Sequence, residues 1–153
     1  MSDTKIGSVL SGVAGEYFVA GELSKRGYIA SITLRNTKGV DIVCSNSEAS
    51  KTVSIQVKTN RRSDTNWVLN KKAEDYYADN LFYVFVNLNL EKDGVPAYYV
   101  VPSKFVADHA RTTHQQWLDT PNRNGGKHND NTMRKFSDPN QDFLDRWDLL
   151  ELG

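Results

Sequence analysis

Two short stretches decide how this chain folds, and they are Val40-Asp41-Ile42-Val43-Cys44 and Thr52-Val53-Ser54-Ile55-Gln56-Val57-Lys58. The second stretch alternates strictly between apolar and polar residues, which predicts a strand with Gln56 and Lys58 on one face and the valines and isoleucine on the other. The first stretch places Asp41 at the start of an apolar strand. The side chains of Asp41, Gln56 and Lys58 are therefore expected to meet at one edge of a hairpin.

The segment before these strands predicts a helix over residues 7–26 that ends at Gly27, with basic residues in its last turn. Three- and four-residue steps define its expected inward stripe, which comprises Val9, Val13, Glu16, Ala20 and Leu23. The carboxylate of Glu16 then lies within the inward stripe. Alternatively, Glu16 lies at the border of the stripe and reaches water or a lysine.

The remaining elements follow from apolar periodicity and turn residues. A strand at 28–34, a turn at 36–39 and short polar loops predict that the first three strands are antiparallel neighbours. Residues 81–88 are apolar on both faces, which predicts a central strand paired with 97–101. The other expected elements are an edge strand at 67–69, helices at 71–79, 103–110 and 113–118, a long loop at 119–132, a strand at 133–136, and a terminal helix from 138 with Phe143, Trp147 and Leu150 as its seam.

Length and bulk composition predict one globular domain spanning residues 1–153, and the expected mixture of helices and strands makes its class α/β. The chain is 39% hydrophobic and 25% charged, and its formal net charge is zero, which argues against a protein that coats nucleic acid by charge alone. No apolar run approaches the roughly 20 residues of a membrane span, and the first residues lack a leader pattern, so we expect a cytoplasmic protein without a membrane partner. The single cysteine, Cys44, is expected to be a buried small hydrophobe.

The order of elements and polar residues resembles the PD-(D/E)XK nuclease superfamily. In that superfamily a glutamate of the first helix, an aspartate of the second strand and an acidic-x-lysine motif of the third strand converge on a divalent metal. The matching residues here are Glu16, Asp41, and Gln56 with Lys58. The resemblance covers about residues 7–88 and leaves 91–153 as a C-terminal extension. The stretch Gly15-Glu16, together with the strand Val40 to Val43, also resembles the Holliday-junction-resolvase-like and methylation-dependent restriction branches.

This resemblance implies a restriction-endonuclease-like fold, α-β-β-β-α-β, with a mixed sheet flanked by helices. It implies hydrolysis of DNA phosphodiesters with Mg2+ or Mn2+ held by Asp41, Gln56 and Glu16. Lys58 would orient the water or stabilise the transition state. Gln56 departs from the usual acid, although some branches carry Gln here. The resemblance further allows a homodimer, in which two sites would cut two strands.

Basic residues surround the predicted site, and they are Arg61, Arg62, Lys71 and Lys72. They are expected either to contact nucleic acid or to form a solvated surface. A second basic cluster lies further along the chain, at Arg123, Lys127, His128, Arg134 and Lys135. This cluster would close over a duplex or simply form a loop.

Three function classes remain open, and several others are disfavoured. The first is the nuclease. The second is a catalytically inactive nuclease-fold module that binds nucleic acid or protein. The third is an immunity-like partner of another protein, in which Asp41 and Lys58 form a buried ion pair. His109 and His114 are five residues apart, do not share a helical face for zinc and are expected at the surface. The sequence has no glycine-rich nucleotide loop and no serine-hydrolase signature.

Overall fold

The computed structural model describes residues 6–34 and 37–153. Its elements, in chain order, are α1 (Ser8–Lys25), β1 (Ile29–Ile32), β2 (Ile42–Ser45), β3 (Thr52–Asn60), β4 (Asn66–Asn70), the 3-10 turn η1 (Lys71–Glu74), β5 (Leu81–Asn87), β6 (Ala97–Pro102), α2 (Ser103–Asp119), β7 (Met133–Ser137) and the 3-10 turn η2 (Trp147–Leu150). The predicted turn at 36–39 begins at Asn36, which lies outside the described residues.

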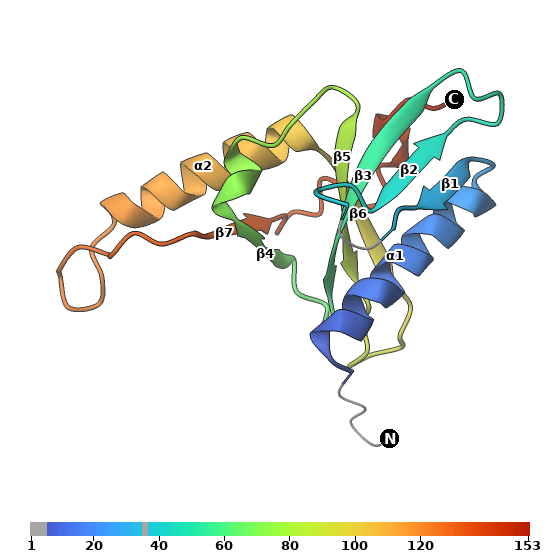
Figure 1. Cartoon of the computed structure of the whole chain (residues 1–153). Coiled ribbons are helices and arrows are strands. Elements are labelled where there is room, and N and C mark those ends of the chain that lie inside the picture. Colours follow the sequence, from blue (N-terminus) through green and yellow to red (C-terminus); the bar gives the residue numbers. More distant parts are fainter. Residues whose placement is uncertain (1–5, 35–36) are drawn as a thin grey trace.

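A five-stranded mixed sheet in the order β1-β2-β3-β5-β6 forms the centre of the molecule (Figure 1). β3 and β5 are parallel, and the other neighbours in this sheet are antiparallel. β4 and β7 form a separate antiparallel pair, here named the ribbon. The expected α/β class and mixed sheet flanked by helices are confirmed, as are the antiparallel first three strands and the buried strand β5.

The two faces of the central sheet carry different cores. α1 packs on the face that bears Ile42, Val53 and Ile55, where Val19 and Leu23 of the helix are fully buried. On the opposite face, α2 and the ribbon cover an aromatic core around Tyr83 and Phe85 of β5 (Figure 1). Side chains of β3 alternate between these two faces because a strand has a two-residue period. The polar side of β3 therefore faces away from α1.

The helix predicted at 7–26 is present, but its expected inward stripe is wrong at its first position. Val9 is 67% exposed. The buried residues are instead Ser11, Gly15, Val19 and Leu23, at steps of four. A Cβ added to Gly15 would lie 1.9 Å from Thr59 Oγ1. Gly15 therefore lets α1 approach β3 more closely at this position than a larger residue would allow.

The helix predicted over 71–79 is wrong, since only the single turn η1 forms there. Asn70 caps this turn, its side chain accepting a hydrogen bond from the Lys72 N–H. Further on, the backbone N–H and C=O of Ala78 both bond to the hydroxyl of Ser103, each at 3.1 Å. These backbone groups have a tertiary partner, so the segment follows the sheet rather than coiling.

The two helices expected at 103–118 are one continuous helix, α2, and the predicted terminal helix is wrong. Residues 138–146 are irregular because Gln141 and Asp145 adopt left-handed backbone angles, with φ of 56° and 52°. The supposed seam is divided between the two cores: Phe143 packs against the α2 side, and Trp147 and Leu150 pack on the α1 side.

Within the part of the chain that the structure describes, none of the helices has the length and apolar character needed to cross a membrane.

Candidate active site

The side chain of Asp41 is fixed to the backbone of β3. Its Oδ2 accepts a hydrogen bond of 2.7 Å from the N–H of Val57, and its own backbone N–H donates to the Ile55 carbonyl at 2.9 Å. Thr33 holds the other side, donating its N–H to the Asp41 carbonyl at 2.9 Å. The carboxylate thus takes the place of a strand carbonyl, immediately beside Gln56.

Gln56 and Lys58 lie on the face of β3 that points away from α1. They pair in register with Tyr83 and Phe85 of β5, whose rings belong to the α2-side core. Both side chains are only half-buried, because that core covers β5 and β6 and leaves the polar face of β3 partly open. The backbone bond to Val57 places Asp41 beside the stretch that carries Gln56 and Lys58, and Lys58 acts electrostatically on its carboxyl. That the three side chains meet in one pocket stays a prediction.

The electrostatics of Asp41 combine an unfavourable burial with two favourable partners. Burial raises the pKa of its carboxyl above the ordinary value, while the Val57 N–H and the Lys58 ammonium act in the opposite direction. A charge that is partly removed from water is stabilised by any cation that approaches it. Asp41 is accordingly suited to hold a cation next to Lys58.

Tyr76 is a residue near the site that the sequence did not point to. It lies in the connection between η1 and β5, and its ring rests on Gly39, where an added Cβ would lie 2.4 Å from the hydroxyl. Gly39 also has a φ of 72°, which favours glycine. Burial, and then the negative charge of Asp41, raise the pKa of the Tyr76 hydroxyl. No sequence pattern links these positions, because the link depends on the crossover path.

Glu16 approaches from the other side of the sheet. It is half-buried on α1, directly after Gly15, which is in contact range of Thr59, the neighbour of Lys58. This places Glu16 near the end of β3, where α1 and the strand are closest. That its carboxylate shares one pocket with Asp41, Gln56 and Lys58 stays a prediction.

The potential metal donors are oxygen atoms. A carboxylate has about four acceptor sites, so the Val57 bond leaves capacity on Asp41, and Gln56 offers an amide oxygen. Such a set fits a hard cation such as Mg2+, which is usually held by one or two carboxylates. Over residues 6–34 and 37–153, no group of three or more His, Cys, Asp or Glu is placed to hold a metal ion. Because Gln56 is neutral, Asp41 and Gln56 together offer a single negative charge.

Comparison with solved structures found similar chains. A bacterial homing endonuclease, I-Ssp6803I, superposes with a TM-score of 0.60 over 97% of this chain and 95% of that chain, at 16% identity. The chain has the restriction-endonuclease-like fold. The Holliday junction resolvase Hjc of Archaeoglobus fulgidus superposes with a TM-score of 0.48 over 83% of this chain and 84% of that chain, at 15% identity. No protein-family model matches the sequence, and no curated protein matches it.

The restriction-endonuclease-like fold places the predicted basic residues in different settings. Arg61 donates to the carbonyl of Ile6 at 2.8 Å, which ties the end of β3 to the start of α1. Arg62 lies 4.0 Å from Glu91 in an exposed ion pair. Lys71 and Lys72 are exposed on η1. Of these four residues, the two lysines are exposed, and their side chains make no hydrogen bond or ion pair with the described part of the chain.

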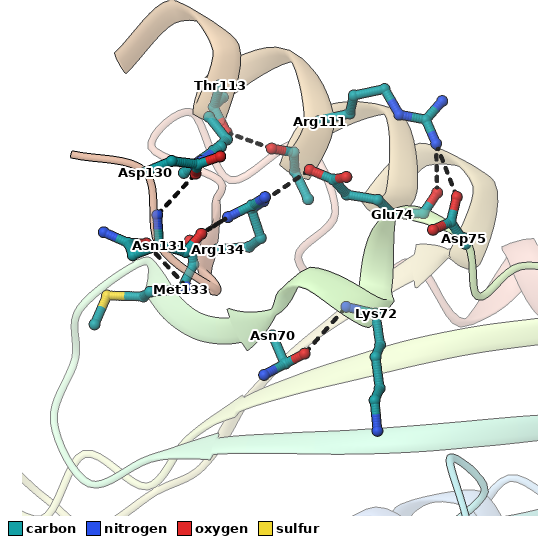
Figure 2. A network of polar contacts seen from close by, with 12 residues as sticks. Asn70, Lys72, Glu74, Asp75, Arg111, Thr113, Asp130, Asn131, Met133 and Arg134 are labelled. Atoms are coloured by element: carbon teal, nitrogen blue, oxygen red, sulfur yellow. Dashed lines mark hydrogen bonds and ion pairs between the residues drawn. The ribbon is translucent and has the colours of Figure 1, made fainter. Parts of the chain in front are cut away.

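In the second basic cluster, Arg134 is not a surface residue. It is 4% exposed, its Nε lies 2.7 Å from Glu74 Oε1, and it donates to the carbonyls of Asn131 and Met133 (Figure 2). The ion pair joins β7 to η1 across the ribbon. No local sequence pattern indicates this ion pair, because the two residues are 60 positions apart.

The histidines are also less exposed than expected. The side chain of His114 is 10% exposed and bonds to Asp130 at 2.7 Å. Burial lowers the pKa of His109, whose ring lies 5.1 Å from that of Phe136. Both histidines are therefore partly buried rather than fully at the surface: Asp130 of the loop before β7 contacts His114, and Phe136 of β7 lies against His109.

Proposed function

We propose that this protein is a metal-dependent nuclease that hydrolyses DNA phosphodiester bonds. Asp41, Gln56 and Glu16 would hold Mg2+ or Mn2+, and Lys58 would stabilise the charge that develops on the phosphate. The observation that carries the proposal is the hydrogen bond from the Val57 N–H to Asp41, which fixes one carboxylate between the positions of Gln56 and Lys58. The restriction-endonuclease-like fold supports it, since the homing endonuclease with this architecture is a nuclease by name.

Each residue has a separate part in this chemistry. A bound divalent cation supplies Lewis acidity and makes water a better nucleophile. Asp41 contributes the negative charge, already desolvated by its surroundings. The ammonium of Lys58 is close enough to favour the ionised form of Asp41 and lies on the open face of β3, where a phosphate can approach. The hydrogen bond from the Val57 N–H would keep the Asp41 carboxylate from forming a direct ion pair with Lys58.

A second candidate is a nuclease-fold module that binds DNA without cutting it. Gln56 favours it, because an amide in place of an acid removes one negative charge from the set of possible metal ligands. In that case the polar face of β3 would bind phosphates through Lys58 but would not activate water.

The deciding experiment measures cleavage of duplex and branched DNA in the presence of Mg2+ or Mn2+. We expect the native protein to cleave, and Asp41→Ala and Lys58→Ala each to lower the rate by at least about 100-fold. Lys51→Ala, at the exposed end of the β2–β3 hairpin, is the matched control and should cleave normally. Cleavage by Asp41→Ala at the native rate would show that Asp41 is not part of the active site. DNA binding without cleavage, combined with activity in Gln56→Glu, would establish the inactive module.

A further inference from the structure

The ribbon has one buried face and one open face. Its strands alternate so that Trp67, Leu69, Arg134 and Phe136 point into the α2-side core. The alternate side chains are exposed, and they are Asn66, Val68, Asn70, Met133 and Lys135. Val68 is 63% exposed and Met133 is 51% exposed, so two large apolar groups lie in water. The open face is thus a mixed apolar and polar surface.

The chemistry of this face suits nucleic acid. It presents two amides, one ammonium and two apolar side chains, and none of the five is acidic. Lys71 and Lys72 follow directly after Asn70. Figure 2 shows Asn70 and Lys72 pointing away from the Glu74–Arg134 ion pair on the inner side. Positive charge therefore flanks the open face at the end nearest η1.

The dimensions of the ribbon match a groove of duplex DNA. Val68 pairs with Lys135 and Asn70 with Met133 across two strands that lie about 4.8 Å apart. Five residues of antiparallel strand extend roughly 17 Å, the length of about five base pairs. The major groove, about 12 Å wide, admits a two-stranded ribbon of this kind.

The ribbon is held rigidly from behind. Arg134 bonds to Glu74, and the Trp67 indole donates to the Val86 carbonyl of β5 at 3.2 Å. Both ends are tied as well, because Lys71 N–H donates to Thr132 at 2.9 Å and Asp138 N–H donates to Thr65 at 3.0 Å. A surface fixed in this way pays little ordering entropy when it binds.

We infer that the open face of the ribbon enters the major groove of the DNA substrate and recognises base sequence. This inference rests on the proposed function, to which it adds a sequence-specific substrate. The amide of Asn66 fits the hydrogen-bonding edge of adenine, Lys135 fits that of guanine, and Val68 and Met133 fit thymine methyl groups. Lys71 and Lys72 contact phosphates beside the groove.

Asn70 has a more restricted part. Its Oδ1 already accepts the Lys72 N–H at 3.1 Å, so its amide presents the NH2 group as a donor. It therefore pairs with an acceptor, such as a purine N7, rather than making the two-bond contact open to Asn66. Because it also caps η1, Asn70 is not a suitable position for the test.

The experiment selects duplexes that bind the protein from a pool of randomised duplex DNA in EDTA, where cleavage is absent. The native protein should enrich a defined motif of about five base pairs. Asn66→Ala and Lys135→Gln should each lower the preference at one or two positions by about tenfold, while binding to the unselected pool changes little. Lys51→Gln removes the same charge at the far hairpin and should enrich the native motif.

Two results would overturn the inference: enrichment of no motif by the native protein, or enrichment of the same motif by both ribbon variants. Thermal melting of the variants checks that the exposed substitutions leave the fold intact. The proposed function is decided separately, by the dependence of cleavage on Asp41. A protein that cuts DNA through Asp41 and selects no sequence would retain that function and refute major-groove recognition.

Discussion

Asp41 and Val57 are joined by a 2.7 Å hydrogen bond from the backbone N–H of Val57 to the carboxylate of Asp41. The side chain of Val57 packs against the α1-side core. The same residue therefore anchors β3 through its side chain and holds the Asp41 carboxylate through its N–H. The hydrogen bond thus holds the carboxylate against a strand that core packing keeps in place.

Asp41→Asn should stabilise the fold while it abolishes cleavage. The amide oxygen can still accept the Val57 N–H, and the substitution removes a charge whose burial is unfavourable. Because the folded-state pKa of Asp41 is raised, the native protein is most stable with Asp41 protonated and loses stability as pH rises through that folded-state pKa. The advantage of Asp41→Asn should therefore be larger at pH 7 than near pH 4, as measured by urea unfolding. An equal advantage at both pH values would contradict the raised pKa.

Gln56→Glu should tighten Mg2+ or Mn2+ binding, on the order of tenfold, because it restores a second acidic ligand beside Asp41. Isothermal titration calorimetry measures the affinity directly. Gln116→Glu, on the exposed side of α2, adds the same charge elsewhere and serves as the control. Equal affinities in the native protein and Gln56→Glu would show that this amide is not a ligand.

Gly15→Ala should destabilise the protein by about 1–3 kcal/mol, because the new methyl group would overlap the Thr59 hydroxyl. Gly12→Ala, three residues earlier in α1, meets nothing within 4 Å and should stabilise the helix by up to about 1 kcal/mol. Denaturant unfolding of the two variants compares the same chemical change in both settings. A loss of stability in both would attribute the effect to the helix itself and not to its contact with β3.

Arg134→Met should cost about 3–5 kcal/mol, since it leaves the carboxylate of Glu74 without its partner in a setting where that side chain is 14% exposed. Adding Glu74→Gln should recover part of this loss, although the carbonyls that Arg134 also serves stay unpaired. A double-mutant cycle measures the coupling. Strict additivity of the two substitutions would mean that the ion pair contributes nothing.

Neutralising Lys71 and Lys72 together should flatten the dependence of log affinity for DNA on log salt by about two units, one for each lost phosphate contact. The double substitution to Gln leaves the backbone bonds of η1 in place. Lys51→Gln with Lys92→Gln removes two charges from exposed loops and is the matched control. An unchanged slope would reassign the η1 lysines to ordinary surface.

Local patterns predicted the strands well, because each strand meets its neighbours through a two-residue period that the sequence carries. The alternation in β3 was sufficient to place Gln56 and Lys58 on one face, and the unbroken apolar run of β5 marked the centre of the sheet. The prediction of a helix was wrong where tertiary hydrogen bonds replace the hydrogen bonds of a helix. Ser103 satisfies both backbone groups of Ala78, and no local signal in 71–79 announces this.

The candidate site could be predicted only in part from the sequence, because some of its contacts are also tertiary. Asp41 directly precedes β2, which pairs with β3, so its proximity to the β3 backbone follows from hairpin geometry. The placement of Tyr76 against Gly39, and of Arg134 against Glu74, depends on the path of the crossover between β3 and β5. The seam of α1 was misjudged at Val9 because valine fits an inward stripe by hydrophobicity, whereas close approach to Thr59 selects glycine.

The irregular segment that replaces the predicted terminal helix bears on the solubility of the protein. β6 is an outer strand of the central sheet, and its unpaired backbone groups would otherwise be a template for another chain. Residues 143–145 cover part of that strand: Val100 N–H donates to the Phe143 carbonyl at 3.0 Å, and Asp145 N–H donates to the Tyr98 carbonyl at 2.8 Å. A regular helix would have bonded these groups internally. The irregular conformation of this segment thus protects the β6 edge of the sheet from pairing with another chain. The opposite edge is the short strand β1, which has four residues.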